Sequence, residues 1–109
     1  MSSDQTFIDF VASQIDYNGE IVFKKMFGEY AAWADGKFFS ILSENRLFIK
    51  PTKAGRSFIG NPTEAPPYPG AKNYFLIEDN IENREWLSEL IRITVAELPE
   101  PKSKKKRKS

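Results

Sequence analysis

The sequence predicts an α+β domain in which helices lie on one face of a mostly antiparallel sheet. Apolar residues repeat at helical spacing near both ends of the chain, and β-branched and aromatic residues are concentrated between residues 20 and 50. An Asp-Gly pair divides this strand-like stretch at residues 35 and 36, as in a tight hairpin. Helices that flank a run of strands typically cover one face of the sheet, which gives two layers. The 109 residues are enough for one hydrophobic core.

Both terminal helices are predicted from apolar periodicity and from end signals. A Ser-x-x-Gln capping box precedes a helix that we expect from about Asp4 to Ile15. The last helix is expected to begin after Asp79 or Asn83, which are good N-caps, and to end before Pro99. Its apolar stripe consists of Leu87, Leu90, Ile91, Val95 and Leu98.

Five strands and a short helix are expected between the terminal helices. The strands are predicted at residues 20–27, 29–34, 37–42, 47–50 and 73–78. Residues 52–60 are expected to form a short helix with Thr52 as its cap, and the proline-rich stretch 61–70 is expected to be a loop. The predicted order is therefore helix, three to four strands, helix, strand, helix.

The Asp-Gly turn also predicts which side chains face the core. A two-residue turn pairs Trp33 with Phe38 and Tyr30 with Ile41. Side chains alternate along strands, so one face would carry Tyr30, Ala32, Phe39 and Ile41, and the other would carry Ala31, Trp33, Phe38, Ser40 and Leu42. The first face is more uniformly apolar and is interpreted as the core face.

The next turn is expected to be a three-residue loop. Alternation indicates that Leu47 and Ile49 face the core. A two-residue loop would place Phe48 opposite Ile41, which conflicts with the predicted core face. We therefore expect a three-residue loop with Asn45 in or near the left-handed region, where asparagine is tolerated.

Composition excludes many kinds of enzyme. The chain contains no cysteine and no histidine, which excludes Ser-His-Asp triads, Cys-His pairs and zinc sites built from these residues. It contains no P-loop and no GxGxxG motif, and its acidic residues are scattered. We therefore expect no catalytic residues, no metal site and no cofactor. We expect a cytoplasmic protein, because no signal peptide is visible and no apolar run approaches the roughly 20 residues that span a bilayer.

Charge divides the chain into an acidic domain, residues 1–98, and a basic tail, residues 99–109, that we expect to be disordered. The tail holds six Lys/Arg and one Glu, whereas the rest holds 10 Lys/Arg and 14 Asp/Glu. The basic residues are Lys102, Lys104, Lys105, Lys106, Arg107 and Lys108. They could bind nucleic-acid phosphates weakly and with strong salt dependence, or they could form only a solvated end.

Two aromatic rings mark a candidate contact surface. We interpret Trp33 and Phe38, with Ser40 and Leu42 beside them, as a patch on the sheet face away from the helices. A protein partner or a second copy of the chain would bind there. In the alternative interpretation, loop 61–72, with Pro66, Pro67 and Tyr68, covers the rings.

Two further groups were considered as sites. Met26, Phe27 and Gly28 could line a ligand pocket, although a more ordinary interpretation is that the Met and Phe fill the core while Gly28 serves the backbone. A second basic patch would form if the first and fourth strands approached each other. It would consist of Lys24, Lys25, Lys50, Lys53 and Arg56.

The stretch "MFGEYAAWADGKFFSILSENRLFIKP" resembles the signature of the TfoX N-terminal domain family, also called the Sxy competence-regulator family. The matching residues are Met26, Phe27, Gly28, Tyr30, Asp35, Gly36, Phe39, Leu47 and Lys50. The resemblance covers roughly residues 5–97, and Glu29 and Ala31 stand where the family usually has glycine.

The resemblance carries expectations about fold and role. It implies a two-layer α+β sandwich similar to secretion-chaperone folds, and a non-enzymatic regulatory role linked to transcriptional regulation of competence. It implies no known catalytic activity. Full-length regulators of this family carry a second, helical domain, so the chain resembles a stand-alone N-terminal domain.

Overall fold

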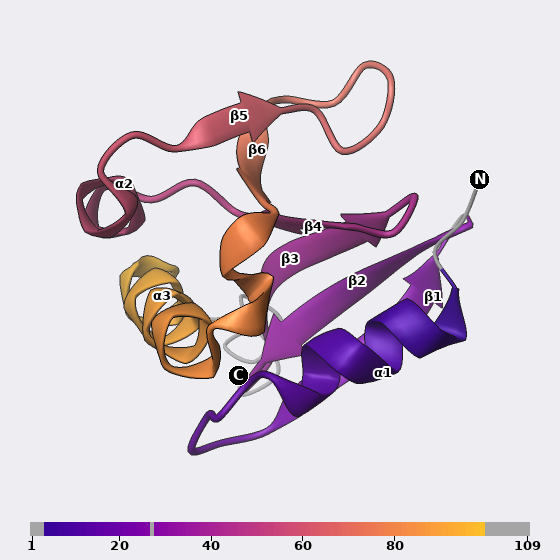
Figure 1. Cartoon of the computed structure of the whole chain (residues 1–109), viewed down its shortest axis with the longest axis horizontal. Helices are drawn as coiled ribbons and strands as arrows, with labels where there is room; N and C mark the ends of the chain where they lie inside the picture. The colour runs from indigo at the N-terminus through magenta and orange to yellow at the C-terminus, as the bar shows by residue number, and fades with distance from the viewer. Residues whose placement is uncertain (1–3, 27, 100–109) are drawn as a thin grey trace, which may run out of the picture.

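Six strands form one antiparallel sheet in the computed structural model, which describes residues 4–26 and 28–99 (Figure 1). The strands are β1 (Ile21–Met26), β2 (Glu29–Ala34), β3 (Lys37–Ser43), β4 (Arg46–Ile49), β5 (Thr63–Ala65) and β6 (Tyr74–Ile77). Their order across the sheet is β1-β2-β3-β4-β6-β5, and every neighbouring pair is antiparallel. The helices are α1 (Gln5–Ser13), α2 (Lys53–Ile59), the 3-10 helix η1 (Asp79–Glu82) and α3 (Arg84–Glu97). The predicted α+β class is confirmed. The predicted capping residue Ser2, Phe27 and the basic tail from Lys102 to Lys108 lie outside the described residues.

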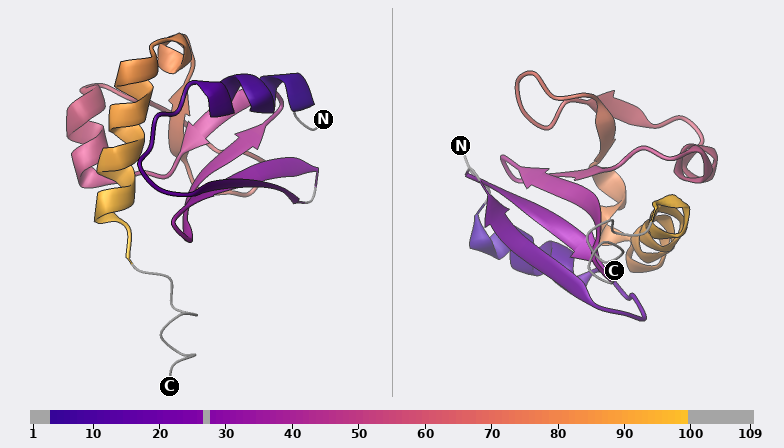
Figure 2. Two further views of the ribbon diagram at one scale, coloured as in Figure 1. Left: turned by 90° about the horizontal axis from the view of Figure 1, so that it is seen from below. Right: turned by 180° about the vertical axis from the view of Figure 1, so that it is seen from behind.

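The core lies between the helices and one face of the sheet, which we call the inner face. Figure 2 shows α1 along this face, while no helix covers the opposite, outer face within the described ranges. The sheet contributes Ala32, Ala34, Phe39, Leu42, Leu47, Ile49, Phe75 and Ile77, and the helices contribute Ile8, Val11, Leu87, Leu90, Ile91 and Val95. Each large apolar side chain in this cluster favours folding by about 1.5–3 kcal/mol. The predicted stripe of α3 is confirmed, with Leu98 packed at its end.

A β-bulge in the first hairpin changes the predicted face of the following residues. Trp33 pairs with Phe38 as predicted, but Ala32 pairs with Ser40 and not with Phe39. The one-residue shift reverses the orientation of every later side chain of β3. The prediction that Ile41 faces the core and Leu42 the outer face is therefore wrong.

The second hairpin has a two-residue turn, so the predicted three-residue loop is also wrong. Ser43 pairs with Arg46, and the two residues between them, Glu44 and Asn45, have φ values of 51° and 56°. These are the positive φ values that a type I′ turn requires. Phe48 lies opposite Ile41, and the bulge removes the conflict, because both residues belong to the outer face.

The proline-rich stretch also differs from its prediction as a loop. Residues Thr63–Ala65 form the short edge strand β5 against β6, and the chain then loops back through residues 66–73. Pairing with β6 satisfies backbone groups that would otherwise be unpaired at this edge. The short helix α2 is confirmed, with the Thr52 side chain accepting a hydrogen bond from the Gly55 amide at its start.

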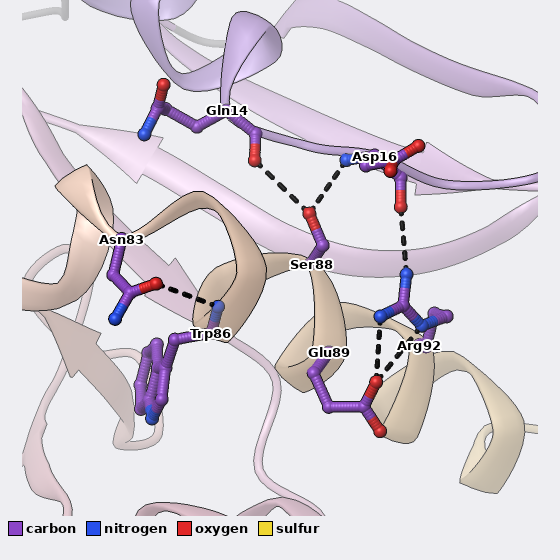
Figure 3. Close-up of polar contacts among 7 residues, drawn as sticks. All are labelled: Gln14, Asp16, Asn83, Trp86, Ser88, Glu89 and Arg92. Carbon is purple, nitrogen blue, oxygen red and sulfur yellow. Dashed lines mark hydrogen bonds and ion pairs between the residues drawn. The ribbon is translucent and has the colours of Figure 1, made fainter.

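Polar contacts fasten the segment after α1 to α3 (Figure 3). The buried hydroxyl of Ser88 accepts a hydrogen bond from the Asp16 backbone amide at 2.8 Å and donates one to the Gln14 carbonyl at 3.3 Å. The Arg92 guanidinium donates to the Asp16 carbonyl at 3.0 Å and pairs with Glu89 at 2.7 Å. Backbone groups that have no partner in secondary structure are satisfied by these side chains.

Candidate interaction surface on the outer face

Trp33 and Phe38 lie directly opposite each other across the first hairpin. Their ring centroids are 5.7 Å apart and the rings are inclined by 52°, a tilted contact that is favourable for aromatic pairs. Both side chains are half-buried, and neither packs against the main core cluster. The prediction that the Asp-Gly turn places this pair on the sheet face away from the helices is confirmed.

Ser40 and Leu42 do not belong to this surface, which corrects the predicted patch. Leu42 has no exposed area and packs in the inner core. Ser40 is also buried, and its hydroxyl donates to the Phe48 carbonyl at 2.7 Å. The bulge at Phe39 is the physical reason, because it turns these two residues inward and turns Ile41 outward.

The corrected outer surface consists mainly of apolar side chains. It contains Val22, Met26, Ala31, Trp33, Phe38 and Ile41, as the strand pairing and alternation place them. Val22 and Met26 are exposed, and Tyr68 of the loop after β5 is the third exposed large hydrophobic residue in this region. Ala31 and Ile41 are buried, so the accessible apolar area comes from these three residues and from the half-buried Trp33–Phe38 pair. Apolar side chains that remain accessible together on one face are typical of interaction sites. We call this set, with Tyr68, the outer-face surface.

Loop 66–73 borders the outer face at the cavity beside Phe38, whereas the alternative interpretation has the loop covering both rings. Pro67 is buried, whereas Tyr68 is 45% exposed. Tyr68 borders a cavity of about 420 Å³ together with Phe38 and Ile41. Trp33 is not among the residues that line this cavity. The loop therefore leaves a hollow beside the aromatic pair.

Met26 lines the same cavity, which contradicts the interpretation that it fills the core. Its side chain is 41% exposed at the end of β1. Gly28, in the turn that follows, has a φ of 85°, and a Cβ added there would meet no atom within 4 Å. Glycine thus serves backbone conformation at this position, as predicted. Phe27 lies outside the described residues.

The second basic patch does not form, because β2 and β3 separate β1 from β4. Alternation places Lys24 on the outer face and Lys25 on the inner side. Lys50 instead lies over the Phe38 ring, with its Nζ atom 5.3 Å from the ring centroid. Arg56 pairs with Glu64 at 2.8 Å. Lys24 and Lys50 therefore both lie near residues of the outer face, whereas Lys25 and Arg56 do not, so the predicted cations do not form one patch.

Other motif residues act as structural supports. The Asp35 carboxylate accepts hydrogen bonds from the Tyr17 hydroxyl at 2.9 Å and from the Glu20 amide at 3.0 Å. Burial, and then the neighbouring Asp35 carboxylate, raise the pKa of Tyr17 above its ordinary value of 10.0. The Tyr30 hydroxyl donates to the Gln5 side chain of α1. These contacts were not predicted from the sequence, because no local pattern joins Tyr17 to residue 35.

Four residues of the cavity were not predicted as site residues: Glu29, Ala31, Ile41 and Tyr68. Glu29 borders the cavity at the start of β2. Tyr68 was considered only as part of the loop that would cover the rings, and not as a residue of a cavity. Within residues 4–26 and 28–99, no group of three or more acidic residues is arranged to hold a metal ion. In the same part of the chain, no helix is both long enough and apolar enough to cross a membrane.

The chain is similar to proteins of one family along most of its length. The family model described as TfoX N-terminal domain matches residues 13–98. A protein of Spirochaeta aurantia, described as an uncharacterized 12.7 kDa protein in the trpE 5′ region, is 41% identical over 105 residues. That match covers 96% of this chain and 91% of the relative.

Proposed function

This chain belongs to the TfoX N-terminal domain family, and we propose that it works by binding rather than by catalysis. The partner, which is another protein or a second copy of the chain, docks on the outer-face surface. The observation that carries this proposal is the Trp33–Phe38 pair, which is half-buried on a face without helices. Tryptophan and phenylalanine are enriched in the centres of protein interfaces.

The surface has the composition that a docking site needs. Its centre is apolar, and Lys24 and Glu29 provide charge of both signs at β1 and β2. An apolar centre with a polar rim allows the domain to stay soluble when free and to lose water from the centre when bound. The family resemblance implies a role in transcriptional regulation of competence, and docking on this surface would serve that role.

A comparison of two tryptophans tests the proposal. Trp33→Ala should weaken self-association or partner binding by about tenfold or more, because interface tryptophans commonly contribute 2 kcal/mol or more. Trp86→Ala is the matched control, since Trp86 also forms a tilted pair, with Phe58 at 5.4 Å, but on the helix side. Sedimentation over a range of concentrations would measure self-association.

Partner binding is measured in the native host by quantitative co-purification with both variants. There, Trp33→Ala should also reproduce the transcript changes of a deletion, and Trp86→Ala should not. Equal behaviour of the two variants in sedimentation and co-purification would contradict docking on the outer face. A cooperative unfolding transition shows that each variant is folded.

The basic tail supports a second candidate function, nucleic-acid binding. Residues 99–109 carry six Lys/Arg, and cations that contact phosphates release counterions. Truncation after Pro99 should abolish binding, and the affinity of the full chain should fall steeply between about 50 and 200 mM salt. A mobility-shift assay at both salt concentrations measures this effect. Binding that survives truncation would contradict a role for the tail.

A further inference from the structure

The cavity beside the aromatic pair has the size and lining of a small-molecule site. Its volume of about 420 Å³ lies within the range of ligand pockets, about 300–1,000 Å³. The walls come from β1, β2, β3 and the loop after β5, so the cavity forms only when the sheet and the loop are assembled. The lining includes Met26, Glu29, Ala31, Phe38, Ile41 and Tyr68.

The apolar part of this lining fits a ring or a short hydrocarbon chain. Ala31 leaves room on the floor of the cavity, because its side chain is a single methyl group. Phe38 and Tyr68 supply aromatic surface, and Met26 supplies a flexible thioether that adapts to different shapes. These four residues would favour a ligand with an apolar body.

Glu29 is the charged residue in the described lining. Its one polar contact among the described residues is with the Ser43 hydroxyl, which donates to it at 3.5 Å, the outer limit of a hydrogen bond. An ionised carboxylate can accept about four hydrogen bonds, so it retains capacity for a cation. Partial burial of Glu29 reduces solvent screening of such a pair.

We propose that this cavity binds a small organic ammonium compound, with its apolar body between Phe38, Ile41 and Tyr68 and its charge at Glu29. Two lysines lie near the cavity, Lys50 over the Phe38 ring and Lys24 opposite Ala31, and both would favour an anion. Neither belongs to the lining, whereas Glu29 does. The proposal goes beyond partner docking and does not depend on it.

The test uses three probes with similar apolar bodies: 2-phenylethylamine, 2-phenylethanol and 3-phenylpropanoate. Each is titrated at pH 7 into the full-length, isotopically labelled protein, and amide chemical shifts give the dissociation constants. The amine should bind about two- to fivefold more tightly than the alcohol, the gain expected for a partly exposed ion pair. Intermolecular contacts with Met26, Phe38 and Tyr68 would place the ring in the cavity.

Two variants separate the role of Glu29 from general effects. Glu29→Gln should remove the preference for the amine while leaving the alcohol's affinity unchanged, which also shows that the cavity is intact. Lys24→Gln, the matched control on the same face, should keep or increase the preference. Tighter binding of 3-phenylpropanoate, no saturable binding of the amine, or a preference that survives Glu29→Gln would each overturn the proposal. None of these outcomes bears on the Trp33→Ala test of docking.

Discussion

Two tryptophan–phenylalanine pairs, one on each side of the sheet, have similar geometry and different surroundings. Phe58 and Trp86 have ring centroids 5.4 Å apart, and Trp33 and Phe38 have centroids 5.7 Å apart. The first pair joins α2 to α3 and packs against the core cluster. The second pair lies on the outer face, apart from that cluster. The distance between two rings therefore does not reveal the role of the pair. What distinguishes the two pairs is whether they pack against the core cluster.

The same contrast extends to the two faces of the sheet. Helices α1 and α3 pack on the inner face. The Ser88 hydroxyl of α3 accepts a hydrogen bond from the Asp16 amide and so joins α3 to the segment after α1. The outer face is covered in part by one loop, which leaves a cavity and exposed apolar residues. Substitutions on the inner face should chiefly affect stability, whereas those on the outer face should chiefly affect binding. Two pairs of variants test this division, and a third pair tests a contact between two helices on the inner side.

The largest difference in stability is expected between variants of two neighbouring residues of β3. Leu42→Ala removes a fully buried inner side chain and should lower the free energy of unfolding by about 2–5 kcal/mol. Ile41→Ala should lower it by less, near the lower end of that range, because Ile41 borders an existing cavity. Urea denaturation measures both values. The opposite ranking would contradict the placement of Leu42 in the core and of Ile41 at the outer face.

Two buried serines provide an intermediate effect. Ser88→Ala leaves the Asp16 amide without its partner on the helix side and should cost about 1–3 kcal/mol of stability. Ser43→Ala, its counterpart at the outer face, loses a single 3.5 Å contact with a partly exposed carboxylate, so it should cost less than about 1 kcal/mol. Equal losses of stability for the two variants, measured by thermal or urea unfolding, would contradict the expectation that polar contacts contribute more on the inner face than on the outer face.

Glu97, whose carboxylate joins α3 to α2, should give the smallest effect on stability, and this effect should depend on pH. Hydrogen bonds from the backbone amides of Ala54 and then Lys53 hold the pKa of Glu97 below its usual value of 4.5. Because the folded-state pKa is the lower one, the stabilisation is present above pH 4.5 and is lost as the pH falls through the folded-state pKa. Glu97→Gln should therefore destabilise the protein at neutral pH and make little difference in acid.

The test compares the stability difference between wild type and Glu97→Gln at neutral pH with the same difference in acid. Urea unfolding of the wild-type protein and of Glu97→Gln is measured at about pH 7 and at a series of lower pH values that passes below the ordinary pKa of 4.5. Glu82→Gln, which changes an exposed carboxylate of η1, serves as the comparison for a general change in surface charge. A difference in the free energy of unfolding between wild type and Glu97→Gln that stays constant with pH would contradict stabilisation by the ionised Glu97 carboxylate.

Much of the fold followed from local patterns, because the preferences involved act over a few residues. Periodicity identified the terminal helices, and Asn83 and Thr52 were recognised as caps. The Asp-Gly pair identified the first turn, since its residues adopt positive φ readily. That turn was enough to place Trp33 opposite Phe38.

The candidate site was predicted less completely, because one inserted residue changes every face assignment after it. Nothing local in "KFFSIL" shows whether Phe39 is bulged; the choice depends on whether Phe39 and Leu42 can both pack beneath the helices. The second turn was mispredicted for the same reason. The cavity required still more distant information, since its wall includes Tyr68, far along the chain from Met26.

By itself, the sequence determined the α+β class, the terminal helices, the hairpin at Asp35-Gly36 and the chemistry that lacks histidine and cysteine. Tertiary structure alone decided the bulge, the pairing of β5 with β6, the outward direction of Ile41 and the cavity that brings Glu29 near Tyr68. The physical reason is the distance along the chain over which each effect acts. Turn and helix preferences depend on neighbouring residues, whereas burial depends on how elements far apart in the sequence pack together.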